Sequence, residues 1–266
     1  MKIKKSLKKI WQFCLRNYFL LIFFGCIAFV GLVSAYKLFI AKPTYVYVKV
    51  KVGQGTWWAS TQKPSMWFVN AIKNAKVQTD LTGAPVASIL DLRYYPAVPQ
   101  SLAANNAYNN QYDAFVTLRL KVSQLGRSGK YNFNRSTIGV AAPVDFEFSN
   151  VQFSGTITEL QTTPLASNYE ERIITLAKPI TSQWEFEQIK IGDQYFDGQE
   201  NIFEILDKNL GINEEGNNYV TVQAKIKVKK IDNQLLFAEE QVVAPGKSIF
   251  IVTNNLVFDG FNITSV

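Results

Sequence analysis

The chain has 266 residues and a formal charge of +7, from 28 basic and 21 acidic side chains, and it contains no histidine. Eight of the basic residues fall within positions 1–42, which leaves 20 basic and 21 acidic residues in 43–266. This distribution excludes a nucleic-acid-binding domain, because such a domain carries its positive charge on the folded surface. The absence of histidine excludes Ser-His-Asp and Cys-His catalytic sites and His-ligated zinc or haem.

The N-terminal end predicts a membrane anchor. A basic head, 1–17, has no acidic residue, and a largely apolar segment, 18–41, follows it. A helix over the uncharged positions 18–36 would be about 28 Å long, close to the hydrocarbon thickness of a bilayer. Because basic flanks stay in the cytoplasm, we expect a single-pass plasma-membrane protein with 43–266 outside. Five lysines of the head should contact anionic lipid headgroups: Lys2, Lys4, Lys5, Lys8 and Lys9.

A cleaved signal peptide is the alternative to an anchor. Val-Ser-Ala at 33–35 would allow cleavage after Ala35. The apolar run is longer than a usual signal-peptide core and continues past Ala35, which favours a retained signal anchor. Both cysteines, Cys14 and Cys26, precede position 43, so the outer part can form no disulfide and must rely on its hydrophobic core.

The outer part is predicted to be mainly β. Residues 45–52 alternate between valine and Tyr or Lys, which is the pattern of a half-buried strand. Short β-branched and aromatic runs continue to the C-terminus between Gly, Pro, Asn and Asp. Two short segments, 66–76 and 202–210, are the best candidates for helices.

The outer part also repeats itself. Segment 116–122 matches 220–226 in pattern, 150–155 matches 255–260, and 140–143 matches 243–245. A looser match joins 50–53 with 189–192. Four matches in one order predict an internal duplication of a small β-barrel or sandwich unit, present as two tandem copies or as one pseudo-symmetric domain.

The repeat predicts the domain boundaries. Copy one is expected over 43–161 with an inserted loop at 95–112, a linker over 162–171, and copy two over 172–266. Four glycines in the matching segments are predicted to form structural turns: Gly53, Gly155, Gly192 and Gly260.

Segment 193–204 can be compared with a calcium-binding loop. Asp193, Asp197 and Glu204 occupy positions that an EF-hand fills with acidic residues, but its third position holds a tyrosine. The Asp-Gly pair at 197–198 is also a strong signal for a β-hairpin. We expect a hairpin, and neither a metal nor another cofactor.

An aromatic cluster offers a possible binding surface. Trp57, Trp58 and Trp67 could stack against a sugar ring or another ligand or partner, although aromatic residues of β proteins more often fill the core. The acidic residues are scattered, so no paired acid and base can be assigned. We therefore expect no catalytic residues.

Two resemblances bear on function. Segments 190–197, 204–206, 220–228 and 257–260 resemble the DUF4330-like family, bacterial membrane-anchored β-domain proteins, and this resemblance implies an anchored β domain without enzymatic residues. Segments 192–198 and 202–205 are similar to MCE-type lipid-transport domains, which implies lipid handling. The chain departs from the latter by lacking their long helical extension and by duplicating its β unit.

These observations predict an extracytoplasmic β protein with a non-enzymatic binding or structural role in the bacterial cell envelope. Its expected partners are the lipid bilayer, through 18–41, and an envelope protein or a second copy. A lipid-handling component is the alternative, and a carboxylate-dependent hydrolase is a further one.

Overall fold

The computed structural model describes residues 17–39, 43–53, 63–97, 111–125, 129–166, 168–180, 183–212 and 218–266. The chain forms two compact parts, Met1–Pro43 and Thr44–Val266.

The first part contains the helix α2 (Tyr18–Phe39). Its side chains are described at 18–20 and 22–34, where large apolar residues such as Phe19, Phe29 and Leu32 are exposed. Within the described ranges, no helix has both the length and the apolar character that crossing a membrane requires. The anchor over 18–41 therefore stays a prediction, and the five lysines of the basic head lie outside the described residues.

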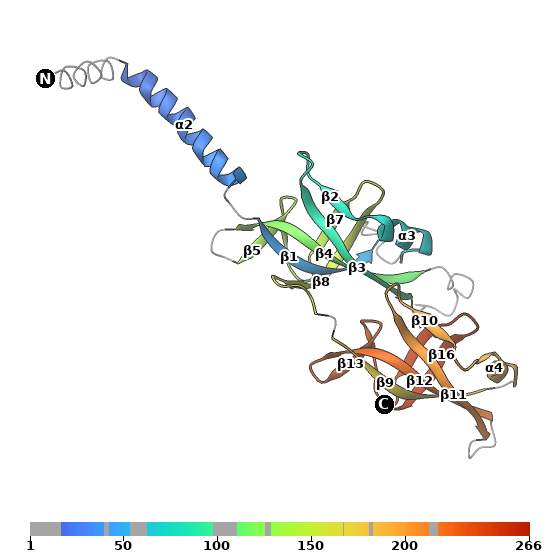
Figure 1. The fold of residues 1–266 in the computed structure, drawn as a ribbon. Coiled ribbons are helices and arrows are strands. Elements are labelled where there is room, and N and C mark those ends of the chain that lie inside the picture. Colours follow the sequence, from blue (N-terminus) through green and yellow to red (C-terminus); the bar gives the residue numbers. More distant parts are fainter. Residues whose placement is uncertain are drawn as a thin grey trace. The chain divides into compact units, whose positions relative to one another are not determined.

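The second part begins with an eight-stranded antiparallel sheet, which we call the first β unit (Figure 1). Six strands lie in the order β2-β3-β4-β1-β8-β7, and β5 and β6 extend from β4. The helix α3 (Met66–Asn74) joins β1 to β2. The strands are β1 (Thr44–Gly53), β2 (Val77–Thr79), β3 (Pro85–Pro96), β4 (Tyr112–Leu125), β5 (Lys130–Phe133), β6 (Ser136–Ile138), β7 (Pro143–Glu147) and β8 (Gln152–Gln161).

A second eight-stranded sheet, the second β unit, repeats this topology. Its order is β10-β11-β12-β9-β16-β15, with β13 and β14 extending from β12. The short helix α4 (Gln183–Gln188) takes the place of α3. The strands are β9 (Tyr169–Pro179), β10 (Gln194–Phe196), β11 (Asn201–Ile212), β12 (Asn218–Ile231), β13 (Gln234–Phe237), β14 (Gln241–Val242), β15 (Ser248–Val252) and β16 (Val257–Ser265). The prediction of two similar β units is confirmed.

The sequence matches have different outcomes. Segments 116–122 and 220–226 occupy equivalent central strands, because β4 pairs with β1 and β3 as β12 pairs with β9 and β11. The match of 50–53 with 189–192 is wrong: the counterpart of β1 is β9, whereas 189–192 follows α4. Alternating strands resemble one another in sequence, so a short match between them does not fix their place in the sheet.

Two element boundaries differ from those predicted. β9 already begins at Tyr169 and pairs with β12 there, so the connection between the units is shorter than 162–171. β3 extends to Pro96 and β4 begins at Tyr112, so the ends of the expected loop 95–112 are strand, while 98–110 lie outside the described residues.

One of the two helix candidates is correct. Segment 66–76 contains α3, but 202–210 lies in β11. The register in which β11 pairs with β12 shifts between Ile205 and Asp207. This bulge interrupts the two-residue alternation of the strand, which leaves apolar residues at spacings that imitate a helix.

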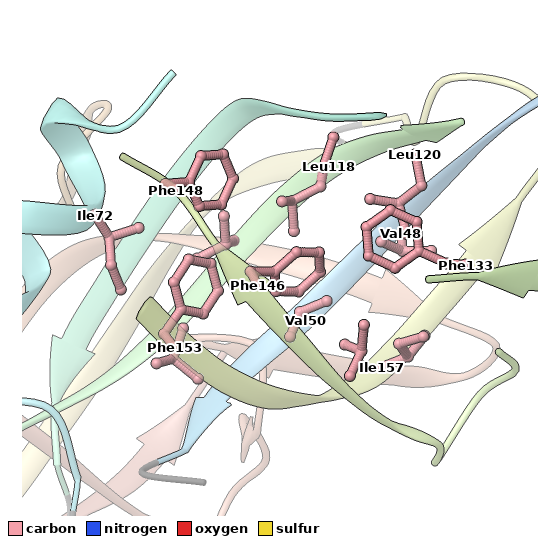
Figure 2. Close-up of a cluster of buried hydrophobic side chains, with 14 of the residues drawn as sticks. Val48, Val50, Ile72, Leu118, Leu120, Phe133, Phe146, Phe148, Phe153 and Ile157 are labelled. Atoms are coloured by element: carbon pink, nitrogen blue, oxygen red, sulfur yellow. The ribbon is translucent and has the colours of Figure 1, made fainter. Parts of the chain in front are cut away.

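Each β unit has its own hydrophobic core. In the first unit, Phe146 lies against Phe133, Phe148 and Phe153, with ring centroids 5.0–6.3 Å apart (Figure 2). The valines of β1 point into this core and are fully buried at 46, 48 and 50, as their alternation predicts. In the second unit Phe203 and Phe258 pack at 5.4 Å. The two cores explain why the chain folds without disulfides in this part.

The four glycines fulfil different roles. Gly192 (φ +86) lies in a turn after α4, and Gly260 (φ +73) lies where the pairing of β15 with β16 becomes irregular, so both use the left-handed backbone that glycine favours. Gly155 is not at a turn: it lies within β8, where a Cβ atom would be 2.5 Å from the Lys51 carbonyl oxygen. Gly53 ends β1 with no atom within 4 Å of such a Cβ.

Candidate functional site at the junction of the two β units

The two β units meet where β3 of the first reaches the β10–β11 hairpin of the second. The Tyr94 backbone N–H donates to the Asp197 carbonyl oxygen at 2.8 Å, and the Tyr195 hydroxyl donates to the Tyr94 carbonyl oxygen at 2.9 Å. Tyr95 and Phe115 of the first unit are 3% and 4% exposed and belong to the core of the second unit. We call this contact region the junction.

A buried ion pair lies at the centre of the junction. Arg93 Nη1 donates to Asp197 Oδ2 at 2.6 Å and to Glu200 Oε1 at 3.0 Å. The other oxygen of Asp197 accepts the backbone N–H groups of Gln199 and Glu200, both at 2.9 Å. Burial alone would lower the pKa of Arg93, but the charge of Asp197 raises it, so the guanidinium stays ionised. The pair fixes the hairpin of the second unit to β3 of the first.

Further ion pairs cross the junction in both directions. Lys49 of the first unit donates to Glu239 of the second at 2.9 Å, and Lys229 of the second donates to Glu159 of the first. The Tyr169 hydroxyl also donates to Glu239. All of these carboxylates thus have a cationic or hydroxyl partner, which is the condition for burying charge at low cost.

Glu239 reaches this position through an unusual backbone. Ala238 and Glu239 have φ of +51 and +69, in the left-handed region that residues with a Cβ rarely adopt. The equivalent turn of the first unit, Asn134-Arg135, has φ of +46 and +69. The second unit therefore uses the same left-handed backbone conformation as the first to place a carboxylate at the junction.

A cavity of about 430 Å³ opens beside these contacts, with walls from both units. Its apolar and aromatic lining consists of Met66, Tyr94, Pro96, Tyr112, Tyr195, Phe196 and Val252. Its polar lining consists of Gln111, Gln194, Asn201, Thr253 and Asn254. None of the described residues that line it has a charged side chain. We call this space the junction cavity.

The lining is partly held in place by its own contacts. The rings of Tyr94 and Tyr112 meet edge to face, with centroids 5.6 Å apart and planes at 87°. Burial raises the pKa of both phenols, so they are neutral at physiological pH. The Asn201 amide donates to Gln194 Oε1 at 2.6 Å. The described lining thus presents neutral hydroxyls, amides and ring faces.

The segment that was compared with a calcium-binding loop is a hairpin. Strands β10 and β11 pair on either side of Asp197-Gly198, as the sequence predicted. Asp193 accepts from the Asn255 amide at 2.6 Å, Glu204 pairs with Lys225 at 2.9 Å, and Asp197 pairs with Arg93. Among the described residues, no group of three or more His, Cys, Asp or Glu side chains could hold a metal ion.

The predicted tryptophan surface is described only in part. Trp67 lies on α3, is 71% exposed and contacts the ring of Phe68. Trp57 and Trp58 lie outside the described residues. Trp67 does not line the junction cavity, although its neighbour Met66 does. The sequence did not indicate the tyrosines of the cavity as a group, because Tyr94 and Tyr195 are 101 positions apart.

Comparisons with known proteins add no assignment. No protein-family model matches the chain, and neither the curated proteins nor the solved structures contain a match.

Proposed function

We propose that this chain is a single-pass membrane-anchored protein of the bacterial cell envelope, which binds a ligand or partner at the junction cavity and catalyses no reaction. The observation that carries this proposal is that the cavity has walls from both β units. A duplicated unit that only spaced two components apart would need no such cavity. Concave sites with mixed aromatic and polar lining are the usual form of small-molecule binding sites.

The rigidity of the junction supports binding. Arg93–Asp197 and the Lys49–Glu239 pair hold the two walls in one geometry before any ligand arrives. A preformed site loses less conformational entropy on binding than one that must be assembled. The described lining contains no carboxylate, so hydrolysis by carboxylates has no support at this site.

The cellular location rests on the sequence. The basic head and apolar segment would place the junction cavity outside the cytoplasm, and the resemblance to DUF4330-like proteins agrees with an anchored β domain. Lipid handling, the MCE-like alternative, is less favoured. Acyl chains in this cavity would displace water from the amide side chains, and these amides would then lack hydrogen-bond partners.

Two measurements in cells test the proposal. Protease added to spheroplasts should digest 43–266 and spare the basic head; a protected β region would overturn the orientation. A photo-crosslinking amino acid in place of Phe196, which is 46% exposed in the cavity lining, should capture a bound molecule. The same amino acid in place of Ile231, which is 42% exposed, is the control. Equal or no capture at both positions would contradict a binding role for the cavity.

A further inference from the structure

The junction cavity combines features that together select a chemical class of ligand. The geometry points to a neutral saccharide, of about the size of a mono- or disaccharide, as the molecule bound there. This inference rests on the proposed function and goes beyond it by naming the ligand class.

The first argument is charge. A phosphate, carboxylate or ammonium group inside the cavity would lose its hydration without meeting an opposite charge from the lining residues that the structure describes, because none of these is ionised. Two carboxylates that are next to lining residues in the sequence are already paired: Asp197 with Arg93, and Asp193 with Asn255 and Thr253. Ionic ligands are therefore disfavoured.

The second argument is hydrogen bonding. An amide side chain offers a donor and an acceptor side by side, and a sugar hydroxyl can also both donate and accept. Gln111, Gln194, Asn201 and Asn254 supply four amides around one space. The Asn201–Gln194 hydrogen bond orients two of them, and the Asn201 oxygen remains an acceptor. A polyhydroxylated ligand can satisfy such a lining, whereas an acyl chain cannot.

The third argument is shape. Sugar rings have apolar C–H faces that pack against aromatic rings, which carry a negative potential on their faces. Tyr94 and Tyr112 stand at 87° to each other, and Phe196 is partly exposed at the cavity. The volume of about 430 Å³ falls within the roughly 300–1,000 Å³ of small-molecule sites. The cavity therefore combines aromatic ring faces and amides in a volume that suits one or two sugar rings.

The test uses the full chain in lipid nanodiscs, prepared with a detergent that has no sugar headgroup. Maltose and N,N′-diacetylchitobiose are the neutral probes, glucuronate is the charged probe and tetra-alanine the peptide probe. Binding is followed by saturation-transfer NMR and calorimetry. At least one neutral disaccharide should bind, and Phe196→Ala and Asn201→Ala should each weaken it by about tenfold. Matched surface substitutions in the second unit, Ile231→Ala and Asn233→Ala, should leave the affinity unchanged.

The outcomes separate the two proposals. If neither disaccharide binds, if the cavity variants bind as well as the wild type, or if tetra-alanine or glucuronate binds more tightly, the saccharide inference is wrong. Capture of a protein or lipid at position 196 together with absent sugar binding would remove only this inference. Absence of any capture at position 196 would remove the proposed function as well. Circular dichroism of each variant verifies that a lost affinity is not a lost fold.

Discussion

The Arg93 guanidinium of the first β unit lies 2.6 Å from the Asp197 carboxylate of the second, and Asp197 is completely buried. This pair couples the two units, because Asp197 also fixes the turn of the β10–β11 hairpin through two backbone N–H groups. Arg93 further stacks over the ring of Tyr169, 4.5 Å from its centroid. A single side chain of the first unit thus contacts two separate elements of the second.

Arg93→Ala should destabilise the protein severely. The substitution leaves the Asp197 carboxylate buried without its cation, which typically costs about 3–5 kcal/mol. The measurement is urea unfolding followed by far-ultraviolet circular dichroism. Arg172→Ala is the matched control, because Arg172 pairs with Glu170 on the exposed face of β9 and such pairs contribute about 0–1 kcal/mol. Similar midpoints for the two variants would contradict the role given to Arg93.

Acid should loosen the junction before it unfolds either core. Hydrogen bonds from Lys227 and Arg93 lower the pKa of Glu200. Burial alone would raise the pKa of Glu159, but its bond to Lys229 and the charge of Lys49 lower it overall. Both groups therefore add stability above their unfolded pKa of about 4.3, and this stability is lost as pH falls through their lower folded values.

The contribution of Lys229 to stability depends on pH in the opposite direction. Burial would lower its pKa, but Glu159 and Glu239 raise it overall, so its contribution is present below about pH 10.4 and is lost only at higher pH. We expect hydrogen exchange at residues 194–200 to be constant from about pH 5 to 10, after correction for intrinsic rates, and to accelerate below pH 4. The variant Glu159→Gln/Glu200→Gln should show a smaller acid effect. An unchanged acid effect in that variant would mean that other groups control it.

The sequence predicted the fold better than the junction. Alternation identified β1, and repeated segments placed β4 and β12 as counterparts, since these patterns depend on local burial. Arg93 gave no such indication: its partner lies 104 positions away in the other unit, and its equivalent in β11 is a glycine by strand register. A contact that only one copy makes cannot be predicted from the segments that the two copies share. The cavity could not be predicted for the same reason, because its tyrosines come from three different strands.

Asp197 illustrates this limit. From the sequence alone, Asp-Gly and Asn-Gly turns are interchangeable at 197–198, which predicts that Asp197→Asn is neutral. With Arg93 in contact, the amide keeps the turn but removes the charge that balances the guanidinium. Asp197→Asn should now destabilise the protein, though less than Arg93→Ala, because an amide oxygen still accepts hydrogen bonds.

Chelation of divalent ions should have no effect on stability. Asp193, Asp197 and Glu204 each have a protein partner. The melting temperature should be the same with and without EDTA. A calcium ion at a hundred times its dissociation constant would add about 2.7 kcal/mol, so a downward shift in EDTA that calcium restores would show that a site exists after all. Glu204→Gln should then remove the calcium response.

Gly155→Ala should disturb both the first β unit and the junction. A Cβ atom at 155 would lie 2.5 Å from the Lys51 carbonyl oxygen and 2.5 Å from Val50 Cγ1, so β1 and β8 must separate. Such overpacking costs about 1–3 kcal/mol, which lowers the melting temperature by several degrees in a part of this size, at about 2–4 °C per kcal/mol.

The effect should also reach the second unit, because β1 carries two lysines of the junction. Lys49 pairs with Glu239 at 2.9 Å and Lys51 with Glu240 at 2.6 Å, so a displaced β1 pulls both away from their carboxylates. Hydrogen exchange at 238–242 should therefore accelerate in Gly155→Ala. Gly53→Ala is the control on the same pair of strands: its Cβ meets no atom of the described residues within 4 Å, so stability and exchange should match the wild type. If Gly155→Ala lowers the melting temperature but leaves exchange at 238–242 unchanged, β1 does not transmit its displacement to the second unit.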